Sequence, residues 1–387
     1  MSRPALLAAV AVATFVTAAA CADEADPADA PSGGGTATVT EGLAALPADL
    51  GGASDEGEGE GEGDYATFTW SNLDRAAELA GVEPPADEGD VLAVADYVSA
   101  ISGGPTESGE PSPVVALLPE TSNVYGATHV MDEFRDEVGW NVLDVDSFAE
   151  QDAPPVAITA MSGDFDPAAI SEAMGEPEDG TWSVGKEGEI SPEDVTAARP
   201  LGQALYLTEA GDGLAVSRGE DHTDGLRSVA GDRDASVAAD DIMAAVAGAL
   251  DDAGAYSAMI VRPGLLAGGG ALDPREMAAQ CDASPQVPTH ATATGIADDG
   301  GPVILVVEAY GSADDAEAGA AALEQVATDG ESLATGQPWS ELLQFEGVDT
   351  TGPDGTVAVM RLRPTEDGRA SLWRDLILQR DNLVGYC

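Results

Sequence analysis

The sequence contains very little positive charge. Its 387 residues include 71 Asp and Glu but only 15 Lys and Arg, which gives a formal net charge of −56. Lys186 is the only lysine. Proteins that bind nucleic acid do so largely by placing Lys and Arg against phosphate groups. The composition therefore excludes nucleic acid as a partner.

The acidic residues are spread along the whole chain and do not form one acidic tail. In dilute buffer their mutual repulsion disfavours the compact state. At about 1 M salt the Debye length is only about 3 Å, so the repulsion is largely screened. Uniform acidity with almost no lysine resembles the surfaces of proteins from salt-loving bacteria. The alternative is a specific cationic partner, which usually requires a concentrated acidic patch, and none is evident.

Long apolar runs are also scarce, and the first of them lies at the start of the chain. Arg3 precedes the run Ala5–Ala20, whose last residues are small alanines that lead into Cys21. A charged start, an apolar middle and small residues before a cleavage point are the features of a secretory signal. The cysteine at that point resembles the signal of bacterial lipoproteins. The resemblance implies that residues 1–20 are removed and that Cys21 becomes a lipidated N-terminus at the outer face of the cell membrane.

Two other interpretations of this segment stay open. One is an ordinary signal peptide in which the cysteine occurs by chance. The other is a single-pass membrane anchor, although about 16 residues, mostly alanine, are short and weakly apolar for a span.

The chain has only three cysteines. If Cys21 carries lipid, Cys281 and Cys387 remain as an even pair in an oxidising compartment, where disulfides form and persist. We therefore expect a disulfide between Cys281 and Cys387. The alternative is two separate thiols.

Residues 21–64 are predicted to form a disordered acidic tether. They are rich in Asp, Ala, Pro and Gly, and Glu56–Asp64 reads EGEGEGEGD. Alternating Gly and Glu cannot bury apolar surface and repel one another, which favours an extended, solvated chain. Thr36–Leu50 has some apolar content, and we expect it to be ordered only transiently. Such an arm would hold the folded part away from the membrane.

Folded sequence is predicted to begin near Tyr65. Apolar residues at helical spacing, together with caps and glycine stops, predict helices over residues 71–80, 90–101, 123–138, 240–250, 275–281, 314–328 and 371–380, and from 166 onward. Short apolar runs bounded by turn residues predict strands at 156–161, 181–184, 204–208, 214–217, 257–261, 290–297, 303–309, 343–348 and 356–362.

Two stretches of the chain resemble each other. Val156–Met174 and Ile304–Leu323 each combine an apolar strand, a glycine, an acidic helix start and an alanine-rich helix, the signature of an internal repeat. The repeat predicts an α+β fold of two related halves, 65–230 and 231–387, each an antiparallel sheet with helices packed on one face. The pattern after Tyr65 resembles acidic lipoproteins of high-GC Gram-positive bacteria, a group of unassigned function that supplies no catalytic motif.

Two short motifs match known catalytic signatures only in part. Gly180–Lys186 has the G-x-x-x-x-G-K skeleton of a phosphate-binding loop, but Glu187 stands where that loop needs a hydroxyl for magnesium. Ser183–Lys186 matches the S-x-x-K of penicillin-binding enzymes, which also need a second motif with its own lysine. Since Lys186 is the only lysine, neither motif predicts a site.

Histidines and cysteines do not combine into a metal site. The three histidines lack the spacing of a zinc pair on one helix, and no cysteine has another close by. They are His129, His222 and His290. We therefore predict no metal and no cofactor.

Pairs of carboxylates are so frequent that most carry no information. Asp144 and Asp146 begin like a calcium loop, but Phe148 occupies the third ligand position. Asp164 and Asp166 lie at the end of a predicted strand, where carboxylates can act as acid and base or bind a cation. The more ordinary role of this pair is to cap the following helix.

Aromatic residues make up only 5% of the chain, so most of the five tryptophans are expected in the core. A tryptophan-lined ligand cleft is the alternative. Trp339 follows Pro338 in a polar loop and is the least core-like of the five.

Together these patterns predict a lipid-anchored extracytoplasmic protein without catalytic activity, which binds an envelope protein or a small ligand. The alternative is a hydrolase that acts on the cell envelope through a carboxylate pair. The sequence does not identify the ligand.

Overall fold

The computed structural model describes residues 36–48, 66–106, 109–121, 130–153, 156–186, 191, 193, 195–211, 213–229, 232–262, 287–332, 334–366, 368–378, 381 and 383. The signal segment, His129, all three cysteines and the elements predicted between 265 and 281 lie outside these residues. The predicted disulfide therefore stays a prediction.

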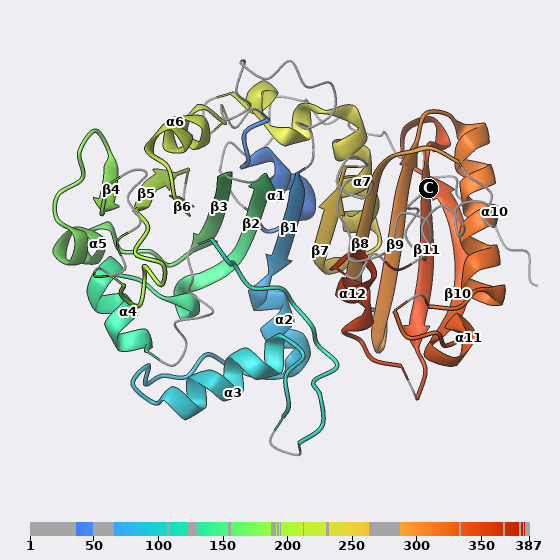
Figure 1. Ribbon diagram of the computed structural model, residues 1–387, viewed down its shortest axis with the longest axis horizontal. Coiled ribbons are helices and arrows are strands. Elements are labelled where there is room, and N and C mark those ends of the chain that lie inside the picture. The colour runs from blue at the N-terminus through green and yellow to red at the C-terminus, as the bar shows by residue number, and fades with distance from the viewer. Residues whose placement is uncertain are drawn as a thin grey trace, which may run out of the picture. The chain divides into compact units, whose positions relative to one another are not determined.

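Eleven strands form one antiparallel sheet, and the strand order is β10-β11-β9-β8-β7-β1-β2-β3-β6-β5-β4 (Figure 1). The strands are β1 (Thr67–Asn72), β2 (Val145–Ala153), β3 (Val156–Gly163), β4 (Thr181–Val184), β5 (Leu205–Ala210), β6 (Gly213–Ser217), β7 (Ala255–Val261), β8 (Thr289–Asp298), β9 (Pro302–Tyr310), β10 (Leu343–Thr351) and β11 (Val357–Pro364).

The pairing of β1 with β7 makes this a single sheet. Thr67 lies opposite Val261, and the ladder continues to Ser71 opposite Ser257. The α+β class is confirmed. The two separate sheets expected for residues 65–230 and 231–387 are instead one, because β1 and β7 join edge to edge.

The helices lie on both faces of the sheet. They are α1 (Val39–Ala44), α2 (Leu73–Ala80), α3 (Val91–Ile101), α4 (Met131–Val138), α5 (Pro167–Met174), α6 (Glu220–Val229), α7 (Asp241–Asp252), α10 (Ala313–Asp329), α11 (Trp339–Leu342) and α12 (Leu372–Leu378). One face carries α2 to α5 and α10 to α12, and the other carries α1, α6 and α7. The expectation of helices on one face is wrong, since α7 and α10 of the second half lie on opposite faces.

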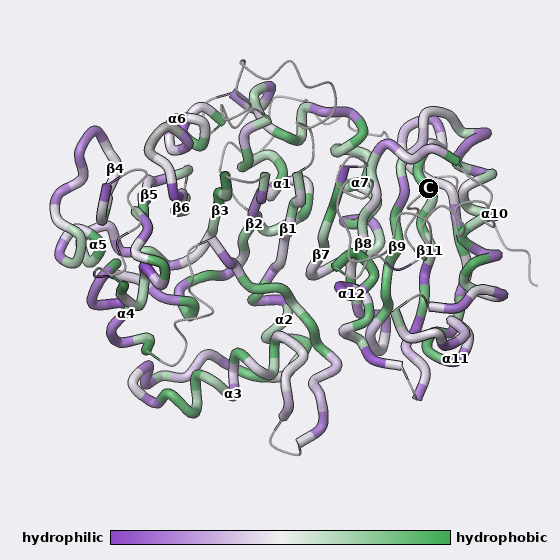
Figure 2. The backbone as a smooth tube through the Cα atoms, in the orientation of Figure 1, coloured by the Kyte–Doolittle hydropathy of each residue, from purple (hydrophilic) through white to green (hydrophobic). Residues whose placement is uncertain are grey.

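Each face of the sheet has its own apolar core. Along β9, Ile304 and Val306 belong to one cluster, whereas Leu305 and Val307 belong to the other. Both sets are fully buried, so β9 is apolar without a break from Val303 to Val307 instead of alternating. Figure 2 shows the same property in β7, which is hydrophobic along most of its length.

Several helix boundaries follow the predicted signals. The Asn72 side chain caps α2, which ends at Gly81 in the left-handed conformation, and Asp90 caps α3. Asp166 caps α5, with Pro167 at the first turn, as expected from capping chemistry. Just before residue 230, the predicted end of the first half, lies α6, whose Leu226 is buried.

The segment 36–48, which was assigned to the disordered tether, is ordered. Thr38 caps α1 with a full capping box. Asp251 at the end of α7 accepts hydrogen bonds from the amides of Val39 (2.8 Å) and Thr40 (3.1 Å), and the Trp70 indole donates to the Thr36 carbonyl at 2.7 Å. The tether prediction is therefore wrong for these residues. The rest of 21–64 lies outside the described part of the chain.

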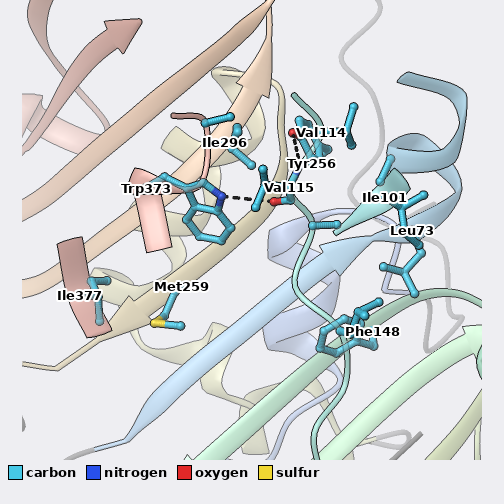
Figure 3. Packing of buried hydrophobic residues seen from close by; sticks show 14 of the residues in the cluster. Leu73, Ile101, Val114, Val115, Phe148, Tyr256, Met259, Ile296, Trp373 and Ile377 are labelled. Atoms are coloured by element: carbon cyan, nitrogen blue, oxygen red, sulfur yellow. Dashed lines mark hydrogen bonds between the residues drawn. The ribbon is translucent and has the colours of Figure 1, made fainter. Parts of the chain in front are cut away.

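A segment without regular structure, residues 112–121, crosses the sheet where β7, β1 and β2 are neighbours. We call it the crossing segment. The Val115 amide donates to the Tyr256 hydroxyl at 3.1 Å, and the Trp373 indole of α12 donates to the Val115 carbonyl at 3.2 Å (Figure 3). The Leu117 amide donates to the Ser257 hydroxyl at 3.1 Å. The segment therefore fastens the C-terminal helix to the joint between β1 and β7.

Candidate binding site

A buried carboxylate, Glu150 of β2, holds the far end of the crossing segment. Its Oε2 accepts three hydrogen bonds, from the amides of Glu120 (3.1 Å) and Thr121 (2.8 Å) and from the Thr159 hydroxyl (2.6 Å). Thr159 lies directly opposite Glu150 on β3. The Oε1 atom accepts no hydrogen bond from the described residues, so half of the carboxylate retains its bonding capacity.

Burial dominates the electrostatics of Glu150. The residue is only 7% exposed, and this burial raises the pKa of its carboxyl above the ordinary value, although the hydrogen bonds from Thr159 and Thr121 act in the opposite direction. The negative charge of Glu120 raises that pKa further. A carboxyl in such an environment can either accept or, when protonated, donate a hydrogen bond.

Arg218, which follows directly after β6, is a cation on which the charge of Glu150 acts. Burial lowers the pKa of its guanidinium to about 10, the charge of Arg199 lowers it too, and the charge of Glu150 raises it. A like charge and an opposite charge therefore both act on Arg218. Its Nη1 makes a long hydrogen bond of 3.5 Å to the Ala198 carbonyl.

Arg199 is held rigidly beside Arg218. It is 6% exposed, and it donates from Nε to the Gln203 carbonyl at 2.6 Å and from Nη2 to the Gly202 carbonyl at 2.8 Å. Its loop is fixed from α4, because both oxygens of Glu137 accept the amides of Ala197 and Ala198. We call Glu150, Thr159, Arg199 and Arg218 the polar cluster.

Sequence reasoning did not predict the polar cluster. Glu150 was one carboxylate among many. The amides that donate hydrogen bonds to it belong to Glu120 and Thr121, about 30 positions earlier in the sequence. The two arginines carried one usable signal, which is that basic residues are rare in this chain. None of the residues in the cluster belongs to a recognised motif.

Ser217 and His222 form the nearest approach to a nucleophile and base. The Ser217 hydroxyl lies 3.4 Å from His222 Nδ1, at the limit of a hydrogen bond. However, the same hydroxyl donates to the Gly219 carbonyl at 2.9 Å and accepts from the Gly219 amide at 3.0 Å. Because Ser217 is fully buried, its hydroxyl fixes a turn and is not presented to a substrate.

The carboxylate pair behind the hydrolase alternative is not assembled as a pair. Asp166 Oδ1 accepts the Ala168 amide at 2.9 Å and so caps α5. Asp164 acts instead on Asp146, whose pKa is raised first by burial and then by Asp74 and Asp164. Asp144, the other residue of the possible calcium loop, pairs with Arg135 at 2.9 Å.

The two partial motifs lie in a strand, in keeping with their rejection. Gly180–Lys186 covers β4 and its flanking turns, whereas a phosphate-binding loop leads into a helix. Lys186 itself is exposed. Among the described residues, no group of three or more His, Cys, Asp and Glu side chains has the geometry to hold a metal ion.

All five tryptophans are core residues. Trp70, Trp140, Trp182, Trp339 and Trp373 are at most 4% exposed. The expectation that Trp339 is the least core-like is wrong, because Trp339, at the start of α11, is buried in one of the two apolar cores. Trp182 and Phe165 do line a small open pocket of about 180 Å³ beside α5, but too little of the indole is exposed to form a stacking platform.

Comparisons with protein-family models, with curated proteins and with solved structures give no match. The class of the protein is therefore defined by its own fold, an α+β body on one eleven-stranded antiparallel sheet. In the described part of the chain no helix is both long and apolar enough to cross a membrane.

Proposed function

We propose that this chain is a protein that is held by a lipid anchor at the outer face of the cell membrane. It binds a small ligand without changing it chemically. The observation that carries the binding role is the polar cluster, in which Glu150 of β2 is buried, Arg218 directly after β6 is partly buried, and neither forms an ion pair with a described residue. Buried charged groups cost free energy unless they are paired. Retaining them at a fixed position is what a recognition site requires.

The binding role predicts that at least one member of a chemically varied panel stabilises the protein through this cluster. The panel contains trehalose, calcium chloride, spermidine, and the sodium salts of phosphate, sulfate and citrate. Every solution has the same ionic strength of about 1 M. A ligand that binds only the folded state raises Tm. We expect Glu150→Gln to remove most of that increase, as measured by differential scanning calorimetry.

The control for this panel is Glu78→Gln, which removes a carboxylate whose side chain is 68% exposed. It should respond to the panel as the wild type does. The binding role fails if no compound raises Tm, or if Glu150→Gln keeps the full increase while its circular dichroism is native.

The anchor gives a second prediction. Cys21→Ser should release the protein into the soluble fraction or leave the precursor unprocessed, because the serine hydroxyl cannot take the thioether-linked lipid. Membrane fractionation and the mass of the mature N-terminus measure this. Cys281→Ser is the matched control and should stay on the membrane. Unchanged processing and retention of Cys21→Ser would disprove the lipid anchor.

We further propose that the two halves derive from a duplication. The argument is the order of elements around the joint. In each half three strands follow one another across the sheet, a helix (α5 or α10) comes after the third, and the last strand of the half (β6 or β11) lies beside the third. The stretches Val156–Met174 and Ile304–Leu323 occupy corresponding places in this order. We also propose a disulfide between Cys281 and Cys387.

A further inference from the structure

We infer that Arg199 and Arg218 bind an oxyanion, the carboxylate, sulfate or phosphate group of a small molecule. The inference rests on the proposed binding function and names the class of its ligand.

The first argument is the contrast with the other arginines. Seven arginines make ion pairs with carboxylates: Arg75, Arg135, Arg227, Arg262, Arg361, Arg363 and Arg374. Within the part of the chain that the structure describes, Arg199, Arg218 and Arg369 make none, and of these three only Arg369 is exposed. Acidic residues outnumber basic ones by 71 to 15, so acidic partners are abundant. Two neighbouring guanidinium groups that pair with no described carboxylate form a site for an external negative charge.

The second argument is preorganisation. The backbone carbonyls of Gly202 and Gln203 fix the Arg199 guanidinium, and its loop is bound to Glu137 through two amides. Those bonds use Nε and Nη2, and no described residue accepts a hydrogen bond from Nη1 of Arg199. Arg218 contributes further donors, since the Ala198 carbonyl accepts only one long bond from it. A fixed fork of donors matches the planar or tetrahedral oxygens of an oxyanion, often in bidentate fashion.

The third argument is charge balance. Arg199 and Arg218 repel each other in a partly desolvated environment, and an anion placed between them removes that repulsion. Among the described carboxylates, Glu150 acts favourably on Arg218, but both Glu150 and Glu137 already accept other hydrogen bonds. Glu137 is engaged by the Ala197 and Ala198 amides, and Glu150 is engaged by the crossing segment and Thr159.

The test is isothermal titration of the full mature chain with sodium phosphate, sodium sulfate and sodium citrate in separate arms, at an ionic strength held near about 1 M with sodium chloride. We expect at least one arm to show saturable binding with one site. Arg218→Gln and Arg199→Gln should each weaken it by about 30-fold or more, because a buried charge in the complex loses its partner. Arg218→Lys should weaken it less, because it keeps the charge but loses the fork.

The matched control is Arg374→Gln, which removes one positive charge from α12, where Arg374 makes a long ion pair of 4.0 Å to Asp375. It should bind as the wild type does. Circular dichroism and Tm establish that Arg218→Gln is folded, and Arg199→Gln provides an independent variant if it is not. Equal affinity in the wild type and in both folded glutamine variants would overturn the inference.

The outcomes also separate this inference from the proposed function. If trehalose, calcium or spermidine stabilises the protein in a Glu150-dependent manner while all three anions fail, the binding role stands and the oxyanion class is wrong. If no compound binds, both are wrong. The identity of the arm that succeeds distinguishes a carboxylate ligand from a sulfate or a phosphate.

Discussion

Raising potassium chloride from about 0.05 M to about 2 M should increase the Tm of the mature protein by about 10 °C or more, because added ions shorten the screening length from beyond 10 Å to a few ångströms. The chain carries a formal net charge of −56, and this charge repels itself in the compact state. Few cations offset it locally, and the ion pairs that exist are mostly exposed and weak.

Scanning calorimetry across a salt series measures this effect. Sucrose at matched osmolality is the control, because it alters solvation without screening charge and should give a smaller increase. Sodium chloride should act as potassium chloride does. A Tm that does not change with salt would contradict a folding adaptation to salt and would favour a specific cationic partner instead.

Trp373→Ala should lower the free energy of unfolding by about 3–5 kcal/mol, the usual cost of removing a buried tryptophan. The side chain is fully buried, lies near Met259 and Ile296, and reaches the Val115 carbonyl (Figure 3). Its loss leaves a cavity and also releases the crossing segment from α12. Trp373→Phe should cost about 1–3 kcal/mol, chiefly because the Val115 carbonyl then lacks a donor.

Urea unfolding in molar salt measures both variants. The control lies on the same helix: Leu378 is 63% exposed, and Leu378→Ala should change stability by no more than about 0.5 kcal/mol. If Trp373→Ala were no more destabilising than Leu378→Ala, α12 and the crossing segment would not depend on each other.

The elements that depend on neighbouring residues were predicted. The helix starts at Asn72, Asp90 and Asp166 could be predicted because a capping side chain acts only on the first turn of its own helix. The strands β8 and β9 could be predicted because both are largely apolar and a glycine-containing turn separates them. In each case the residues that decide the structure are close together in the sequence.

Two strands in the middle of the sheet, β1 and β2, were not predicted, because they depend on contacts that are distant in the sequence. β2 reads VDSFAEQDA, and acidic residues are unfavourable in strands. It is a strand because β1 and β3 flank it and because amides of the crossing segment satisfy Glu150. β1 reads TFTWSN and was overlooked just ahead of the helix it leads into. The polar cluster depends on these same distant contacts, and so no local pattern marks it.

The position of β1 has a consequence for the order in which the chain folds. β1 finds its first partner, β2, within the first half, but its second partner, β7, lies 194 residues further on, at Val261 opposite Thr67. The chain is synthesised from its N-terminus. One side of β1 therefore stays unpaired until β7 has been made, about half of the sequence later. Unpaired strand edges recruit other chains. Two copies of so acidic a nascent chain repel each other, and we expect this repulsion to keep the open edge free until its own partner arrives.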